Sequence, residues 1–171
     1  TCETGPHYLL MCQDDLQDLG RFKMNPPLRD KADMEALVEG LLDGTIDMIA
    51  TDHAPHSAEE KAKGLEKSAF GTVGSETAFA VCYTQLVRSG ALTLEKLTEL
   101  MSCKPAAIIG RRAEIAVGEN ADIAVFDLNG KFTVDPEKFV SKGKSSPFTG
   151  TELYGVTELT VCAGNIVYRR R

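Results

Sequence analysis

The stretch Thr51-Asp52-His53-Ala54-Pro55-His56 decides the fold, because it places a carboxylate and two imidazoles directly after a short apolar run. That run, Ile46-Asp47-Met48-Ile49-Ala50, has the composition of a buried strand, so Asp52 is expected where the strand ends and a loop begins. In a parallel α/β barrel, the loops that leave the strand ends surround a central cavity and carry the catalytic groups. The stretch therefore predicts a strand-end site, although a capped turn with polar loop histidines would contain the same residues.

A helix is predicted immediately before this strand. Asp30 is a suitable N-cap and Gly44 is a suitable stop. A helix followed by a turn and a buried strand forms an α/β unit. The apolar face of the helix, at the spacing i, i+3, i+4, i+7, consists of Met34, Leu37, Val38 and Leu41.

Two further segments are candidates for contact with a ligand. In Asn25-Pro26-Pro27, the prolines hold the backbone extended, so the Asn25 amide is presented at a fixed place. An amide both donates and accepts hydrogen bonds, which suits a substrate that contains a cyclic amide or urea. A loop that only connects two elements would have the same sequence. The charged run 57–64 is predicted to be a long mobile loop that leads to the Phe70-Gly71 turn. Gly71 would let the backbone approach a ligand closely, although a glycine that only makes the turn would look the same.

The remaining chain predicts two helices and then a β-rich part. The helices follow Ser75 and Thr93, and Pro105 is expected to break the second one. Near the start of the chain, Gly5-Pro6 is expected to place His7 on a loop, and structural roles are favoured for His7 and Glu3. Strands are predicted at 121–127, 132–134, 159–162 and 166–168, with the last two joined as a hairpin through Ala163-Gly164-Asn165.

Composition excludes several classes of protein. The chain has 171 residues, 43% of them hydrophobic, and 19 Lys and Arg against 25 Asp and Glu, for a net charge of −6. This balance lacks the basic footprint of a nucleic-acid-binding protein, and no run reaches the ~18 apolar residues of a membrane helix. Five scattered cysteines favour free thiols in a reducing compartment, so a cytoplasmic protein is expected. The start at Thr1, which processing would also produce, predicts the C-terminal part of a longer chain.

Taken together, these motifs resemble the bacterial dihydroorotases of the amidohydrolase superfamily. The resemblance implies an α/β fold in which residues 1–112 form the C-terminal units of a (β/α)₈ TIM barrel of the amidohydrolase type. Residues 113–171 would supply the C-terminal strands of a small composite β-sandwich domain. The motifs that carry the resemblance are Asn25-Pro26-Pro27-Leu28-Arg29, Thr51-Asp52-His53-Ala54-Pro55-His56, Phe70-Gly71 and Gly118-Glu119-Asn120-Ala121-Asp122-Ile123.

The same resemblance implies a zinc-dependent enzyme that reversibly closes N-carbamoyl-L-aspartate to dihydroorotate in pyrimidine biosynthesis. Asp52 matches the family's metal-bound catalytic aspartate, which takes a proton from the attacking hydroxide and passes it to the leaving nitrogen. Asn25 and His56 match substrate-binding positions, and the backbone of Phe70 and Gly71 would contact the pyrimidine ring. His53 matches no metal ligand of the family and is expected to be structural.

The resemblance also leaves alternatives. Other cyclic amidases, the dihydropyrimidinases (hydantoinases) and allantoinases, share Pro-Pro-Leu-Arg and the strand-end aspartate, but Asn25 and His56 favour dihydroorotase. Only one zinc ligand falls within the chain, and catalytic zinc has about three protein ligands, so these residues alone are expected to be inactive. A homo-oligomer is implied, with aspartate transcarbamoylase as a possible partner, and a non-catalytic scaffold for that enzyme is the rival function.

Overall fold

The strand predicted before Asp52 pairs with the beginning of the chain. In the computed structural model, which describes residues 1–170, β1 (Glu3–Thr4) and β2 (Met48–Ile49) run parallel, with Glu3 opposite Met48. Both residues of β2 are buried, as expected for an interior parallel strand. A single parallel bridge between His53 and Thr72 lies beyond the end of β2.

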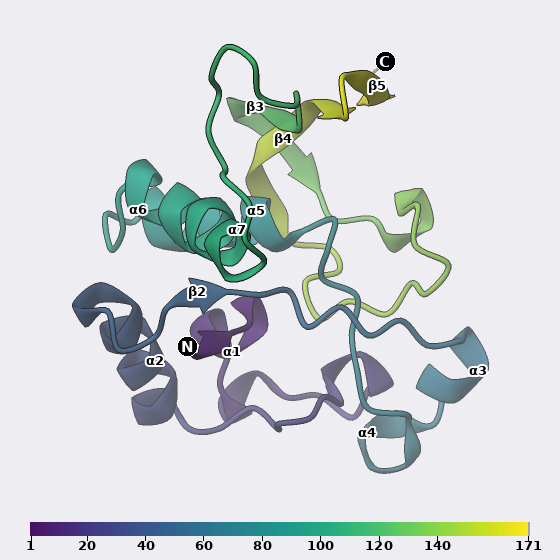
Figure 1. Cartoon of the computed structure of the whole chain (residues 1–171). Coiled ribbons are helices and arrows are strands. Elements are labelled where there is room, and N and C mark those ends of the chain that lie inside the picture. The colour runs from purple at the N-terminus through teal and green to yellow at the C-terminus, as the bar shows by residue number, and fades with distance from the viewer. Residues whose placement is uncertain (171) are drawn as a thin grey trace. The chain divides into compact units, whose positions relative to one another are not determined.

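The contacts within the chain divide it into two units, whose helices and strands are drawn in Figure 1. The first consists of Thr1–Ala78 and Thr133–Thr151, and the second consists of Phe79–Phe132 and the segment from Glu152 onward. Besides β1 and β2, the first unit contains α1 (Pro6–Leu10), η1 (Gln13–Asp15), η2 (Gly20–Phe22), α2 (Lys31–Asp43), α3 (Ala58–Lys61), α4 (Gly64–Lys67) and η5 (Pro136–Lys138).

The helix predicted before β2 is confirmed as α2. The Asp30 side chain accepts a hydrogen bond from the Asp33 N–H at 2.9 Å, and Gly44 ends the helix in the left-handed conformation with φ 86°. Leu41 is fully buried, while the other apolar positions of the predicted face are half-buried. The sequence of helix, glycine turn and buried strand therefore forms as expected.

Two loop predictions in the first unit are wrong. His7 lies in α1 and not on a loop, because Pro6 occupies the first turn, where a helix has no need of the missing N–H. The run 57–64, predicted as a long mobile loop, contains α3 and the start of α4. Ser57 and Glu60 form a capping box at the start of α3, which satisfies the free N–H groups of this short helix.

The helices of the second unit contain π-helical turns. The first, α5 (Ala78–Cys82), continues into η3 (Tyr83–Val87), and α6 (Leu94–Thr98) continues through η4 (Glu99–Cys103) into α7 (Lys104–Ile108). The predicted break at Pro105 is therefore wrong. The Lys104 N–H bonds five residues back to the Glu99 carbonyl, and this wider turn accommodates the proline within a continuous helix.

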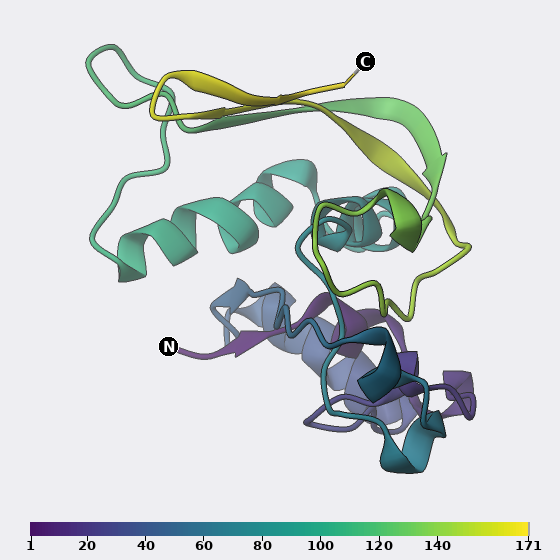
Figure 2. The same ribbon diagram turned by 90° about the vertical axis from the view of Figure 1, so that its right-hand side faces the viewer.

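The second unit also contains a three-stranded sheet in the order β3-β4-β5 (Figure 2). β3 (Ile123–Thr133), β4 (Glu152–Cys162) and β5 (Asn165–Arg169) include the predicted hairpin, which is confirmed with a two-residue turn. Both turn residues, Ala163 and Gly164, have positive φ, as a type I′ turn requires. The predicted strands 121–127 and 132–134 are instead parts of one strand, β3. Gly130 lies within this strand and makes no turn. It leaves room for the Asp127 side chain, because an added Cβ would lie 2.6 Å from the Asp127 carboxylate.

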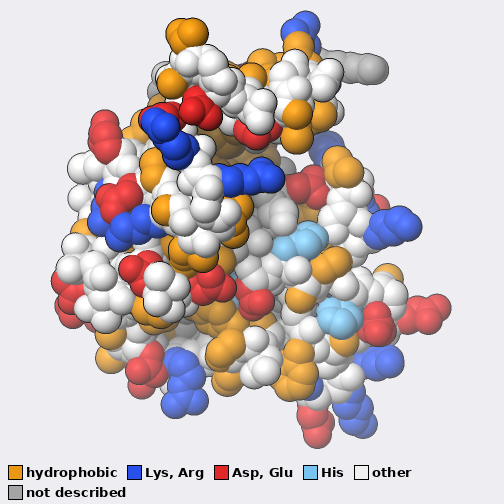
Figure 3. Space-filling view, viewed as in Figure 1, with side chains coloured by type: hydrophobic (Ala, Val, Ile, Leu, Met, Phe, Trp, Pro, Cys, Tyr) orange, Lys and Arg blue, Asp and Glu red, His pale blue; other side chains and the backbone are white. Residues whose placement is uncertain are grey.

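The described residues also test what composition predicted about cysteines, membrane helices and charge. The five cysteines all lie among the described residues, and none of them forms a disulfide, which confirms free thiols. No helix in residues 1–170 is long and apolar enough to cross a membrane. Lys and Arg side chains lie among Asp and Glu on the face shown in Figure 3.

Each unit has its own core of buried apolar side chains. The core includes Leu9, Phe22, Leu41 and Ile49 in the first unit, and Val81, Leu86, Leu97 and Leu100 in the second.

Candidate functional site

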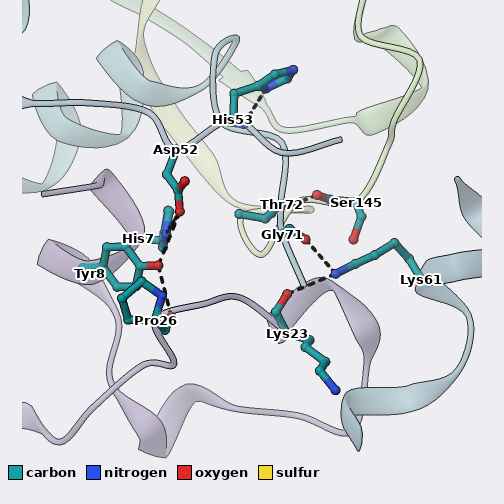
Figure 4. Close-up of polar contacts among 11 residues, drawn as sticks. His7, Tyr8, Lys23, Pro26, Asp52, His53, Lys61, Gly71, Thr72 and Ser145 are labelled. Carbon is teal, nitrogen blue, oxygen red and sulfur yellow. Dashed lines mark hydrogen bonds and ion pairs between the residues drawn. The ribbon is translucent and has the colours of Figure 1, made fainter. Parts of the chain in front are cut away.

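Asp52 lies three residues beyond the end of β2, with its side chain half-exposed. Its backbone has φ 49°, in the left-handed region that aspartate tolerates better than most residues. The side chain points toward His7 and Tyr8 of α1 (Figure 4). A solvent-accessible carboxylate is thus held at the end of a buried strand, as the sequence predicts.

The side chain of His7 faces this carboxylate from below the surface. It is 2% exposed, and its Nε2 atom lies 3.9 Å from Asp52 Oδ2. Burial lowers the pKa of His7 to about 4, although the negative charge of Asp52 acts in the opposite direction. The imidazole is therefore neutral at pH 7, and its Nε2 has no hydrogen-bond partner among the described residues.

Tyr8 joins Asp52 to the segment that carries Asn25. Its hydroxyl lies 3.0 Å from the Pro26 carbonyl oxygen, to which it donates, and 3.4 Å from Asp52 Oδ2. Burial, together with the neighbouring carboxylate, raises the pKa of Tyr8 above its usual value, so the hydroxyl keeps its proton. Asn25 itself is exposed on the loop that Tyr8 anchors.

The two histidines of the central motif have different surroundings. His53 Nδ1 accepts hydrogen bonds from the N–H groups of Gly74 and Ser75 at 3.1 and 3.3 Å, which is a structural role (Figure 4). His56 is half-buried, and its Nδ1 lies 3.5 Å from Glu60 Oε2. His53 is therefore held by backbone N–H groups, whereas His56 lies beside the Gly71 segment.

The segment of Phe70 and Gly71 lies against His56. Gly71 has φ 129°, and an added Cβ would lie 3.2 Å from His56 Cδ2 and 2.7 Å from Ala54 Cβ, so only glycine fits. The Phe70 side chain is exposed, with the Lys23 ammonium 4.5 Å above the centre of its ring. Four of the predicted site residues thus form two neighbouring pairs, Asp52 with the Asn25 loop and His56 with Gly71.

Lys61 is a feature of the site region that the sequence did not reveal. Its side chain is 8% exposed, and its ammonium donates to three backbone carbonyl oxygens, two of which, those of Lys23 and Gly71, are seen in Figure 4. Burial, aided by the positive charge of Lys23, lowers the pKa of Lys61 to about 8. Its neighbours in sequence are charged and exposed, so the sequence contains no sign of its burial. The acceptors are Lys23 O at 3.1 Å, Ala69 O at 2.7 Å and Gly71 O at 2.6 Å.

The side chains of this region do not by themselves fit a zinc ion. Among residues 1–170, no three His, Cys, Asp or Glu side chains are grouped closely enough to hold a metal. The Asp52 carboxylate and the unpartnered Nε2 of His7 are two potential donors, whereas a catalytic zinc has about three protein ligands. A metal at Asp52 would therefore need ligands from elsewhere.

Comparison with known proteins shows the family to which this chain belongs. Residues 25–167 match the amidohydrolase family, which covers most of the chain and includes Asp52. The chain belongs to the amidohydrolase family. Among curated relatives, this amidohydrolase is 51% identical to the dihydroorotases of Lactobacillus leichmannii and Bacillus caldolyticus. The alignments cover 100% and 99% of the chain but 40% of each relative, so the chain spans about two fifths of the length of these relatives.

Solved structures of amidohydrolases have the same fold. L-hydantoinase from Arthrobacter aurescens matches with a TM-score of 0.89 and 36% identity, over 98% of this chain and 39% of that one. D-hydantoinase from Bacillus sp. AR9 matches with a TM-score of 0.87 and 29% identity over the same shares. The chain therefore has an amidohydrolase-type fold with mixed α/β content.

Proposed function

We propose that the full-length protein is a dihydroorotase, which reversibly closes N-carbamoyl-L-aspartate to (S)-dihydroorotate in de novo pyrimidine biosynthesis. The observation that carries this proposal is the 51% identity to dihydroorotases over the whole chain. The chain corresponds to 40% of those relatives, so the activity is assigned to the full-length protein.

Asp52 is the proposed catalytic residue. Its half-exposed carboxylate, at the end of a buried strand, is accessible to a substrate and to water. In hydrolysis it takes a proton from the attacking water and passes it to the ring nitrogen as the amide bond breaks, and in ring closure the same transfers run in reverse. Tyr8 restrains the carboxylate on the side of the Asn25 loop.

Four other residues are proposed to bind the substrate. The exposed Asn25 amide is suited to the cyclic amide, and the imidazole of His56 is suited to the substrate carboxylate. The backbone of Phe70 and Gly71 would contact the pyrimidine ring, because Gly71 has no side chain to keep a ligand away.

We further propose Zn²⁺ as the cofactor of the full-length enzyme, with Asp52 as one of its ligands. The other ligands would come from the rest of the protein, since the described residues of this chain do not group into a complete set. Bound zinc lowers the pKa of a water ligand to near neutral, which is the chemistry that it would provide.

The finer architecture is also part of the proposal. Residues 1–112 would be the last units of a (β/α)₈ TIM barrel, in keeping with the parallel pair of β1 and β2 and with α2 preceding β2. Residues 113–171 would add strands to a composite β-sandwich domain, in keeping with the sheet of β3, β4 and β5. Homo-oligomerisation, association with aspartate transcarbamoylase and a cytoplasmic location stay predictions.

Hydantoin hydrolysis is the second candidate activity. It is favoured by the 36% identity to L-hydantoinase over 98% of the chain, which is lower than the identity to dihydroorotases. The decisive experiment is to purify the full-length protein with zinc and compare its kcat/KM for dihydroorotate, hydantoin and allantoin. We expect dihydroorotate to be preferred by at least about a hundredfold, since a site built for its carboxylate rejects analogues that lack one. Preference for hydantoin or allantoin would contradict the proposal.

A further inference from the structure

The Lys61 ammonium lies between two backbone segments, one at Lys23 and the other at Ala69 to Gly71. Its three N–H donors are matched by three carbonyl oxygens within 3.1 Å, those of Lys23, Ala69 and Gly71. Within the described part of the chain, no carboxylate forms an ion pair with it. The buried charge is therefore stabilised by backbone dipoles whose positions it fixes in turn.

The three acceptors belong to the two segments proposed to bind substrate. Lys23 precedes Asn25 by two residues, and Ala69 and Gly71 lie on either side of Phe70. The Gly71 N–H also donates to the Lys23 carbonyl at 3.0 Å, so the two segments are joined directly as well as through Lys61. A shift of either segment would stretch bonds to the same ammonium group.

The helix that carries Lys61 also connects it to His56. Lys61 is the last residue of α3, whose N-cap Ser57 directly follows His56. Within the same helix, Glu60 lies 3.5 Å from the His56 ring and forms the capping box with Ser57. The single helical turn of α3 therefore fixes the position of the Lys61 ammonium relative to the His56 imidazole.

We propose that Lys61 is a positioning residue, whose ammonium holds the Asn25 loop and the Phe70–Gly71 segment at a fixed spacing around a bound substrate. This inference rests on the proposed function, because those two segments are its binding residues. Burying a charge is costly, and an apolar side chain in its place often stabilises a fold equally well or better. A lysine at this position is therefore better explained by the spacing of its acceptors than by stability.

The test uses the full-length enzyme with Lys61→Met, which keeps the length of the side chain but removes all three donors. Its control is Lys67→Met, which makes the same charge change at an exposed position of α4. We expect Lys61→Met to raise the KM for dihydroorotate about tenfold while kcat stays within about threefold, because Asp52 is untouched. Lys61→Arg, which keeps charge and donors, should recover part of the KM.

A second readout does not depend on activity. Hydrogen exchange of the Gly71 amide should become about tenfold faster in Lys61→Met and stay unchanged in Lys67→Met, because without the ammonium the two segments separate more readily and expose the Gly71 N–H. If Lys61→Met does not fold, Lys61→Gln is measured in its place. Its shorter, uncharged side chain cannot reach all three carbonyl oxygens, so exchange of the Gly71 amide should again be faster, although by less.

The outcomes separate this inference from the proposed function. Unchanged Gly71 exchange, or a KM within twofold of the unsubstituted enzyme, overturns the role of Lys61. If the unsubstituted enzyme does not act on dihydroorotate, the proposed function fails, and the exchange measurement alone decides whether Lys61 holds the two segments together.

Discussion

At the scale of single residues, the site is defined by how two polar groups hold backbone and carboxylate in place. Tyr8 connects Asp52 to the Pro26 carbonyl, and Lys61 connects the Lys23 carbonyl to Gly71. The Tyr8 hydroxyl keeps its proton, and the Lys61 ammonium is occupied by three carbonyl oxygens. Their role is to reduce the freedom of the groups that the proposed reaction uses.

Asp52→Asn is expected to lower kcat for dihydroorotate by at least about a thousandfold in the full-length enzyme. The amide fits the same space but neither accepts the proton nor binds a metal as well. The measurement is steady-state kinetics with zinc content determined in parallel. The control is Asp122→Asn, which changes a carboxylate at the β-rich end of the chain, and retention of more than about a tenth of the activity by Asp52→Asn would contradict the assignment.

Tyr8→Phe removes the hydroxyl that bridges Asp52 and the Pro26 carbonyl. We expect kcat/KM to fall about tenfold, equivalent to the loss of one hydrogen bond to a charged group. Tyr168→Phe on β5, where the side chain is exposed, serves as the control and should leave the kinetics unchanged. Equal values for the two variants would show that the bridge has no effect on catalysis.

At the scale of elements, features that neighbouring residues determine could be predicted from sequence, whereas α1, α3, α4 and several long-range connections could not. The cap of α2 and the turn between β4 and β5 depend on residues a few positions apart, and both were predicted. The hydrogen bonds of Lys61 reach as far as 38 residues along the chain, and no local pattern specifies them. The same is true of Tyr8, whose partner in Pro26 is 18 residues away.

Asp30→Ala is expected to destabilise the protein by about 1 kcal/mol, because α2 loses the side chain that caps its first turn. The matched control is Asp30→Asn, whose amide oxygen still accepts the Asp33 N–H and which should cost much less. Urea unfolding of both variants measures the difference. Equal stability of the alanine and asparagine variants would show that the cap contributes nothing.

The buried Lys61 predicts a dependence of stability on pH. Burial lowers its pKa to about 8 from 10.5, so between these values the unfolded chain binds a proton that the folded chain does not. The free energy of unfolding, relative to Lys61→Met, should therefore increase as the pH rises from about 8 toward 10.5. Urea unfolding of both proteins across this range checks the sign, and a difference that stays constant would contradict it.

At the scale of the whole molecule, the family and its α/β content could be predicted from sequence, whereas the full set of site residues could not. The family and its α/β content follow from motifs that local sequence preserves, such as the segment around Asp52. How many metal ligands this part of the protein supplies stays a prediction, because such ligands come together from segments far apart in the sequence. A cluster assembled from distant segments cannot be derived from any one of them.

The chain of 171 residues is expected to show no hydrolysis of dihydroorotate on its own with added zinc, whereas the full-length protein is expected to be active. The reason is that residues 1–170, as the structure describes them, do not bring together three metal ligands. Isothermal titration of zinc into both proteins, with activity assays on the same samples, tests this expectation. Zinc-dependent turnover by the shorter chain would refute it.

The left-handed backbone of Asp52, with φ 49°, also limits how this position can change in evolution. Most side chains are strained in that conformation, but asparagine and glycine accept it readily. Both are reached from an aspartate codon by one base change, and both remove the carboxylate while leaving the turn relaxed. A descendant of this protein can therefore lose its proposed chemistry in a single mutational step while its fold remains under selection for some other use.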